Sequence, residues 1–201
     1  MAITYTNRKG RLYHLCQGVT KKGTTRYYFS REPKGATVEV LPEGYEIRES
    51  INSIVSLAKI QKSEILECEF SAVQVALQAH PQGNRFQMQT KGKQITIYEN
   101  SSPPPVEMLN AFPDIMEFHK LNGNGLIHAA EELSNKTAQF SPVMRFTLLE
   151  GENPQRYFYA ERMCYRSSID GWLDICSTDS ISNLTSDLIP KLATDDFFDL
   201  I

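Results

Sequence analysis

The sequence predicts an α+β fold, in which an N-terminal antiparallel β meander with an αββ extension is followed by a second α+β lobe. Apolar and polar residues alternate with a period of two through much of the first sixty residues. An apolar stripe at helical spacing follows, and then a run of three prolines interrupts the pattern. We therefore expect an N-terminal lobe over residues 1–100, a proline-rich joint at 101–106 and a C-terminal lobe over 107–201.

The first predicted element is a hairpin whose turn is Lys21-Lys22-Gly23, with the glycine in the left-handed conformation and Thr20 paired with Thr24. Alternation along its two strands predicts one face turned toward the core and another turned outward. A Pro-x-Gly turn at 42–44 leads to the next strand, and residues 54–60 end the meander. The core-facing set is Tyr13, Leu15, Val19, Tyr27 and Phe29, and the outward set is His14, Cys16, Gly18, Arg26 and Tyr28.

A helix and a second hairpin form the extension. An apolar stripe runs from Leu66 to His80 at steps of three and four, and Pro81 ends it. Its start stays open, because Ser63 and Ser71 can each serve as the N-cap. The hairpin over residues 85–99 takes Lys91-Gly92 as its turn, which sets Met88 opposite Ile95, Phe86 opposite Ile97, Gln87 opposite Thr96 and Gln89 opposite Gln94, with the apolar residues facing the core.

Beyond the joint, the pattern predicts helices and strands in sequence. We expect helices at 106–120 and 125–138, then strands at 143–149, 156–165 and 171–175, with residues 150–155 forming a hairpin turn. The chain closes with helical segments at 180–193 and 195–201. Such an apolar ending more often packs onto its own core than onto a partner, and we expect that here.

Cysteines and short motifs indicate no catalytic residue, metal or cofactor. The four cysteines are Cys16, Cys68, Cys164 and Cys176, and they form no CxxC pair, so we expect buried free thiols. His128 and Glu131 share a predicted helix face, but no third ligand accompanies them. The glycines of residues 121–130 lack the lysine of a phosphate-binding loop and fit a junction between two helices.

Charge is distributed unevenly along the chain. Residues 1–36 carry eight cations against Glu32 alone, a local charge of +7, so the remainder sums to −10 from the net charge of −3. The stretch from residue 170 to the end holds seven aspartates and one lysine. No apolar run is long enough for a membrane span and no secretory signal is visible, so we expect a cytosolic protein.

These cations and the neighbouring aromatic residues suggest a binding surface. We hypothesise a non-catalytic interaction or regulatory protein that contacts nucleic acid or an acidic protein surface, including the acidic end of a second copy. The simpler interpretation is a solvated hairpin whose lysines keep a sheet edge soluble. The alternative function is an enzyme with a site between the lobes. The candidate binding residues are Arg8, Lys9, Arg11, His14, Lys21, Lys22, Arg26 and Tyr28.

Overall fold

The structure is a computed structural model that describes residues 2–103, 134, 136–149, 155–166 and 169–200. Antiparallel sheets and helices occur together in it, which confirms the α+β class. The chain forms two compact units, and each is described by itself. Unit 1 comprises residues 1–60 and 101–139, and unit 2 comprises residues 61–100 and 140–201.

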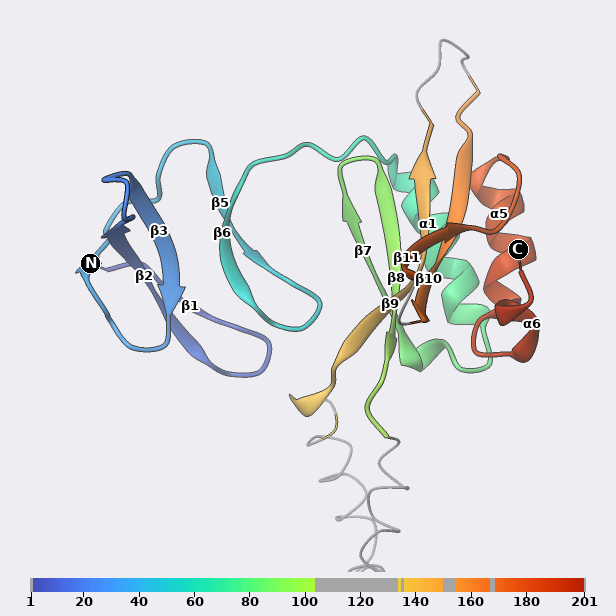
Figure 1. Cartoon of the computed structure of the whole chain (residues 1–201), viewed down its shortest axis with the longest axis horizontal. Coiled ribbons are helices and arrows are strands. Elements are labelled where there is room, and N and C mark those ends of the chain that lie inside the picture. The colour runs from blue at the N-terminus through green and yellow to red at the C-terminus, as the bar shows by residue number, and fades with distance from the viewer. Residues whose placement is uncertain (1, 104–133, 135, 150–154, 167–168, 201) are drawn as a thin grey trace, which may run out of the picture. The chain divides into compact units, whose positions relative to one another are not determined.

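Unit 1 contains two small antiparallel sheets (Figure 1). In the first, β2 lies between β3 on one side and both β1 and β4 on the other. In the second, β5 pairs with β6 alone among the described strands. The strands are β1 (Thr4–Thr6), β2 (Leu12–Val19), β3 (Thr25–Ser30), β4 (Ala36–Thr37), β5 (Tyr45–Glu49) and β6 (Val55–Lys59).

The predicted turns of the meander are confirmed. The Thr20 N–H donates to the Thr24 carbonyl at 2.9 Å, and Gly23 takes a φ of +79° between them. Because only glycine adopts such a φ without steric cost, this residue fixes the turn and the register of β2 against β3. At the next turn, the Tyr45 N–H donates to the Pro42 carbonyl at 3.2 Å.

The predicted faces of the β2–β3 hairpin are correct in part. Leu15 is fully buried, and Tyr27 and Phe29 are half-buried. Val19 was expected in the core and is 72% exposed, because it lies at the outer end of the hairpin, where its partner Thr25 is exposed as well. Cys16 was expected to face outward and is fully buried, because β4 pairs beside it.

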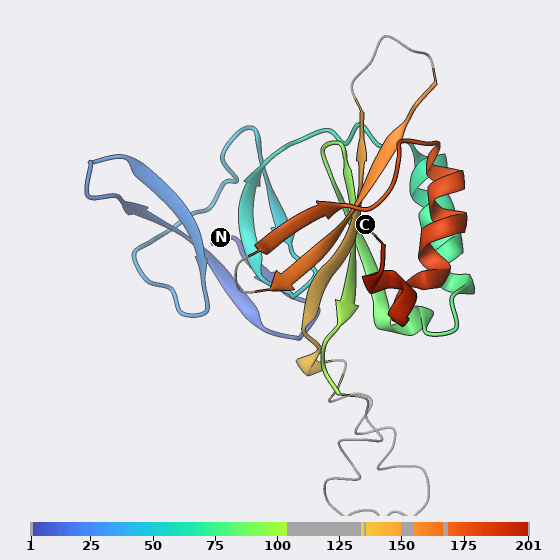
Figure 2. The same cartoon turned by 45° about the vertical axis from the view of Figure 1, so that its right-hand side comes forward.

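Unit 2 is a five-stranded antiparallel sheet in the order β11-β10-β9-β8-β7, with helices on one face (Figures 1 and 2). The longest helix, α1 (Glu67–Ala79), packs beside α5 (Ile181–Leu188). Short helices η1 (Gly83–Arg85), η2 (Ile189–Lys191) and α6 (Asp195–Phe198) complete the helical layer. The strands are β7 (Phe86–Lys91), β8 (Gln94–Asn100), β9 (Phe140–Leu148), β10 (Phe158–Arg166) and β11 (Ile169–Asp174).

The stripe predicted for α1 is confirmed in part, and its N-cap is not. Val73, Leu77 and His80 are buried, Phe70 is half-buried, and Leu66 is 48% exposed. The N-cap is Leu66, so neither Ser63 nor Ser71 caps the helix. The Glu69 carboxylate at N3 instead supplies the second half of a capping box: it accepts the Leu66 N–H at 2.8 Å and places negative charge in the first turn.

The predicted register of the second hairpin is wrong by two residues, although its faces are right. Met88 pairs with Ile97 and not with Ile95, and Lys91 pairs with Gln94. The turn is therefore Gly92-Lys93, with Gly92 at the first central position and a φ of +56°, as a type II′ turn requires. A shift of two residues preserves the alternation, so Phe86, Ile95 and Ile97 are still buried.

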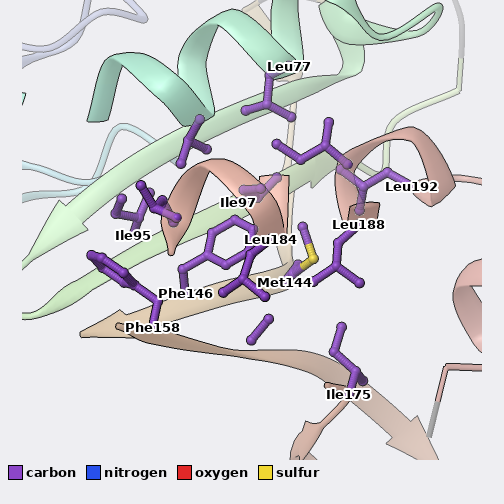
Figure 3. Packing of buried hydrophobic residues seen from close by; sticks show 14 of the residues in the cluster. Leu77, Ile95, Ile97, Met144, Phe146, Phe158, Ile175, Leu184, Leu188 and Leu192 are labelled. Carbon is purple, nitrogen blue, oxygen red and sulfur yellow. The ribbon is translucent and has the colours of Figure 1, made fainter. Parts of the chain in front are cut away.

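One apolar cluster joins the sheet of unit 2 to its helices (Figure 3). Phe146 and Met144 of β9 are fully buried, as is Leu188 of α5. Each such side chain contributes about 1.5–3 kcal/mol by leaving water. Phe197 of α6 is also buried in this cluster, which confirms that the C-terminal segment packs onto its own core.

The two units do not coincide with the expected lobes. β8 precedes the proline tract and pairs with β9, which begins about forty residues after β8 ends. Glu99, for example, pairs with Ser141. Residues 61–100 therefore belong with 140–201. The helices expected at 106–120 and 125–138 lie outside the described residues, except for 134 and 136–138, of which 134, 136 and 137 are helical and 138 is not. Residues 150–154 of the expected turn also lie outside them.

Candidate functional site

The first group of candidate residues lies in the turn between β1 and β2, and Asn7 builds this turn. The Asn7 side-chain oxygen accepts the backbone N–H groups of Lys9 at 3.1 Å and Arg11 at 2.9 Å. Its amide nitrogen donates to the Ser53 carbonyl at 2.7 Å, in the turn between β5 and β6. Because Asn7 is 4% exposed and all these bonds are internal, it holds the β1–β2 turn against the β5–β6 turn.

Arg8 and Lys9 are occupied by contacts within unit 1. The Arg8 guanidinium donates to Glu49 at 2.9 Å and to the carbonyls of Ser50 and Ile51. The Lys9 ammonium donates to the Ala138 carbonyl at 2.7 Å. These side chains therefore stabilise the fold, and they are not free to bind a partner without losing these bonds.

The contacts of Arg8 also change the acidity of Glu49. Burial raises the pKa of this carboxyl group, but the hydrogen bonds from the Arg8 side chain and backbone and from the Tyr5 hydroxyl outweigh it. The net result is a pKa below the ordinary value of 4.5. The hydrogen bond that the Tyr5 hydroxyl donates to Glu49, at 3.0 Å, raises the pKa of Tyr5.

The second group of candidate residues forms the tip of the β2–β3 hairpin. Lys21 and Lys22 lie in the turn, and Arg26 lies on β3 directly across from Gly18. All three cations are exposed, and within the described part of the chain none of them forms an ion pair. We call these three residues the tip cations. Figure 2 shows the hairpin from a second direction.

Tyr28 has a different environment from the one its outward position suggested. Its hydroxyl donates to the Lys34 carbonyl at 2.6 Å. Its ring lies over Gly18, where an added Cβ would stand only 3.3 Å from the ring, and its hydroxyl lies close to Gly35. Tyr28 is therefore half-buried in a contact that closes the loop between β3 and β4, and its hydroxyl is already bonded.

The candidate residues do not form one surface. Arg11 precedes β2 and is exposed, whereas Lys21 follows the other end of β2. The eight residues of β2 separate them by about 24 Å at the usual rise of a strand. His14 lies between these ends, opposite Ser30, and is half-buried. The structure thus brings the tip cations together and leaves the β1–β2 turn as a separate group.

Sequence patterns did not indicate a polar cluster on the sheet face of unit 2 that faces away from the apolar cluster. Arg145 of β9 donates through two nitrogens to the carboxylate of Glu161 on β10, and its guanidinium lies 4.3 Å from the ring centroid of Trp172. The Glu161 side chain is 9% exposed. The Thr147 hydroxyl lies 3.5 Å from the same carboxylate and accepts from Gln94 at 3.3 Å.

Chemically, this polar cluster is satisfied. A bidentate arginine–carboxylate pair uses the charges of both partners, and the cation–π contact covers one face of the guanidinium. The polar cluster therefore orders the sheet and presents no reactive group. The one available signal was the β register, which places Arg145 directly opposite Glu161, and register is not a local property of either strand.

No metal-binding group or membrane-spanning helix is found in the described residues. Within those ranges, no three His, Cys, Asp or Glu side chains gather as metal ligands. The helices that the structure describes include none long and apolar enough to cross a membrane. The expectation of four buried thiols holds for Cys16 alone: Cys164 and Cys176 are half-buried, and Cys68 is exposed, because it lies on the side of α1 away from the core. His128, Glu131 and the segment 121–130 lie outside the described residues.

Comparison of the chain with known protein families, with curated proteins and with solved structures gives no match. The function is therefore inferred from the geometry and charge of the sites themselves.

Proposed function

We propose that this is a non-catalytic interaction protein of the cytosol that contacts an anionic macromolecule through the tip of the β2–β3 hairpin. Lys21, Lys22 and Arg26 supply the attraction. The observation that carries the proposal is that these three cations share one exposed hairpin end and pair with no carboxylate of the described residues. Arg8 and Lys9 keep the adjacent turn in place and do not contact the partner in this proposal.

Charge of this kind acts at long range and speeds association. Three uncompensated cations at one end of a rigid hairpin produce a local positive field in a chain whose net charge is −3. The partner is anionic in this region, which an acidic protein surface and a nucleic acid both satisfy. A rigid turn fixed by Gly23 loses little conformational entropy when it binds, and this favours a specific contact over a diffuse one.

The test compares two triple variants with the same change in net charge. In the first, Lys21, Lys22 and Arg26 are replaced by glutamate. In the matched control, the exposed Lys59, Lys62 and Lys91 are replaced by glutamate instead. Binding of labelled polyglutamate and of a single-stranded oligo-dT is measured by fluorescence anisotropy at low salt.

We expect the wild type and the control to bind at least one of the two polyanions, and the hairpin variant to lose that binding. Exposed charges alter stability by no more than about 0.5 kcal/mol, so all three proteins should unfold alike. If the bound probe is oligo-dT, log K should fall with log salt at a slope of about −2, since three phosphates are neutralised. Equal loss in both variants, or no binding by the wild type, would contradict the proposal.

A further inference from the structure

The outer edge of β3 carries backbone groups with which no described strand pairs. The Thr20 N–H donates to the Thr24 carbonyl, so the pair 20/24 is a hydrogen-bonded pair of the antiparallel ladder. Such pairs alternate with pairs that do not exchange hydrogen bonds. Arg26 and Tyr28 therefore direct their backbone groups toward β2, and the intervening residues Thr25, Tyr27 and Phe29 direct theirs away from it.

These outward groups are unpaired in the described structure. Among the described strands, β3 forms a ladder with β2 alone. β6 lies near β3, but its ladder is with β5. No backbone or side-chain hydrogen bond reaches the N–H or carbonyl groups of Thr25, Tyr27 or Phe29 from the described residues. The edge thus presents three donors and three acceptors in alternation, which is the pattern that another β-strand matches.

The charges around this edge select what can occupy it. Lys21 and Lys22 lie at its start, Arg26 lies within it, and the exposed Arg31 follows its last residue. The nearest acidic residue in sequence, Glu32, is 3.5 Å from the Lys34 ammonium and is already paired. A second copy of this hairpin would bring like charges together, so pairing of two β3 edges is disfavoured. An acidic strand would be attracted along its whole length.

The same groups distinguish a polypeptide from a nucleic acid. A phosphodiester backbone carries acceptors but no donors, so it would leave the outward carbonyl groups of β3 unmatched. A polypeptide supplies both. In addition, Tyr28 packs over Gly18 and bonds the Lys34 carbonyl, so its ring is engaged where a base would need it free.

We propose that β3 is an acceptor edge to which an extended, acidic segment of a partner protein adds as a further strand. This inference rests on the proposed function and specifies its partner. Main-chain hydrogen bonds to Thr25, Tyr27 and Phe29 provide affinity, and the cations at 21, 22, 26 and 31 select acidic side chains. Phe197 of this chain is buried in unit 2, so the acidic C-terminal segment of a second copy is not the partner unless it first leaves its core.

The first experiment uses the full chain and two ten-residue peptides that alternate glutamate with valine. One peptide is unmodified, and the other is N-methylated at its four central nitrogens, which keeps the charge and removes the donors on both of its edges. Binding is measured by fluorescence anisotropy, with a ten-nucleotide oligo-dT beside the peptides. We expect the unmodified peptide to bind at least about tenfold more tightly than the methylated peptide, as the loss of two or more hydrogen bonds implies.

A variant of the chain tests the same contact from the other side. Thr25→Pro removes one outward N–H and breaks no bond to β2, since proline is tolerated at such edge positions. Thr25→Ala is the matched control, because the Thr25 side chain is exposed. We expect roughly five- to tenfold weaker binding of the unmodified peptide by the proline variant, from one lost hydrogen bond and the bulk of the ring, and no change in the alanine variant.

Amide hydrogen exchange gives a readout that does not depend on any variant. In the free protein, the amides of Thr25 and Tyr27 should exchange faster than those of Arg26 and Tyr28. Addition of the unmodified peptide should slow the first two amides.

The outcomes separate the two proposals. Equal affinity for both peptides would overturn strand addition and leave the anionic contact intact. Tighter binding of oligo-dT than of the peptides would replace the protein partner with a nucleic acid. If neither peptide nor oligo-dT binds, both the strand addition and the proposed function fail.

Discussion

Unit 1 and unit 2 are both built on antiparallel strands, but different interactions hold them together. In unit 2, buried side chains from four strands and four helical segments form one continuous apolar cluster. In unit 1, the described part has few buried hydrophobic residues, and they are accompanied by the buried polar residues Asn7, Ser53 and Ser134. The buried hydrophobic residues of unit 1 are Leu15, Cys16, Val38, Val55 and Ala138.

This difference determines which residues of each unit can be substituted without loss of its fold. A large apolar cluster makes stability sensitive to the volume of many side chains. A small core with hydrogen-bonded turns makes stability sensitive to a few polar groups. Such a core also leaves the end of the β2–β3 hairpin exposed on both faces, as Val19 and Arg26 show. Substitutions in the two units should therefore differ in their effect on stability.

The largest effect should come from the apolar cluster of unit 2. Phe146→Ala deletes a fully buried ring at the centre of β9, and we expect the free energy of unfolding to fall by about 3–5 kcal/mol. Urea titration followed by the fluorescence of Trp172, the only tryptophan in the chain, reports on unit 2. Val75→Ala, at a position of α1 in the same unit that is 64% exposed, is the control and should change stability by no more than about 0.5 kcal/mol. Similar losses for both variants would refute the contrast.

The second effect concerns the polar cluster of unit 2. Glu161→Gln leaves the charge of Arg145 without its partner in a site that is nearly buried, and we expect a loss of about 3 kcal/mol. Arg145→Met alone should also lower the free energy of unfolding, because it leaves the Glu161 carboxylate without its partner. When both are replaced, the loss should be smaller than the sum of the two single losses. Additive losses would show that the two side chains do not interact.

A smaller effect is expected from the polar core of unit 1. Asn7→Ala removes three hydrogen bonds and leaves the buried Ser53 carbonyl and the part-buried N–H groups of Lys9 and Arg11 without these partners, at a cost of about 1–3 kcal/mol. Amide exchange should accelerate across β1, β2 and the turn between β5 and β6. The unfolding transition seen by Trp172 should not move, because that residue lies in unit 2. A shift of that transition would mean that the units unfold together.

The smallest expected effect is a dependence of the stability of unit 1 on pH. Since the pKa of Glu49 is lowered in the folded state, its contribution to stability is fully present above its ordinary pKa of 4.5 and is lost as pH falls through the lower folded value. Protection of the β5 amides, measured relative to their intrinsic exchange rates at each pH, should therefore fall in acid in the wild type. In Glu49→Gln, this protection should already be lower at neutral pH and should change less on acidification. An identical pH profile in both proteins would exclude this role of Glu49.

Local signals in the sequence predicted the turns well. Gly23 and the Pro-x-Gly turn at 42–44 were assigned correctly, because each depends on a few adjacent residues. Gly92 was also recognised as a turn glycine, but two adjacent turns preserve the same alternation, so the pattern could not choose between them. Burial of Val73 and Leu77 followed directly from helical spacing.

The pairing of distant segments could not be predicted in this way. The β8–β9 ladder joins strands on either side of the proline tract, and nothing in either strand specifies the other. Arg145, Glu161 and Trp172 come together because three strands share a register, although sixteen residues separate the first two. Within the candidate site, the sequence identified the cations but could not show that Arg8 and Lys9 are held by Glu49 and the Ala138 carbonyl.

The order of the two units along the chain has a consequence for synthesis on the ribosome. Residues 101–139 of unit 1 are made after residues 61–100 of unit 2, so the segments of the two units interleave in time as well as in sequence. At about 5–20 residues per second, unit 1 waits roughly 4–16 s between its sixtieth residue and residue 139. β8 is likewise made before β9 exists to cover its edge. The β8 edge therefore stays without its β9 partner until residue 148 has been made, and an unpaired strand edge of this kind is what other chains pair with during synthesis.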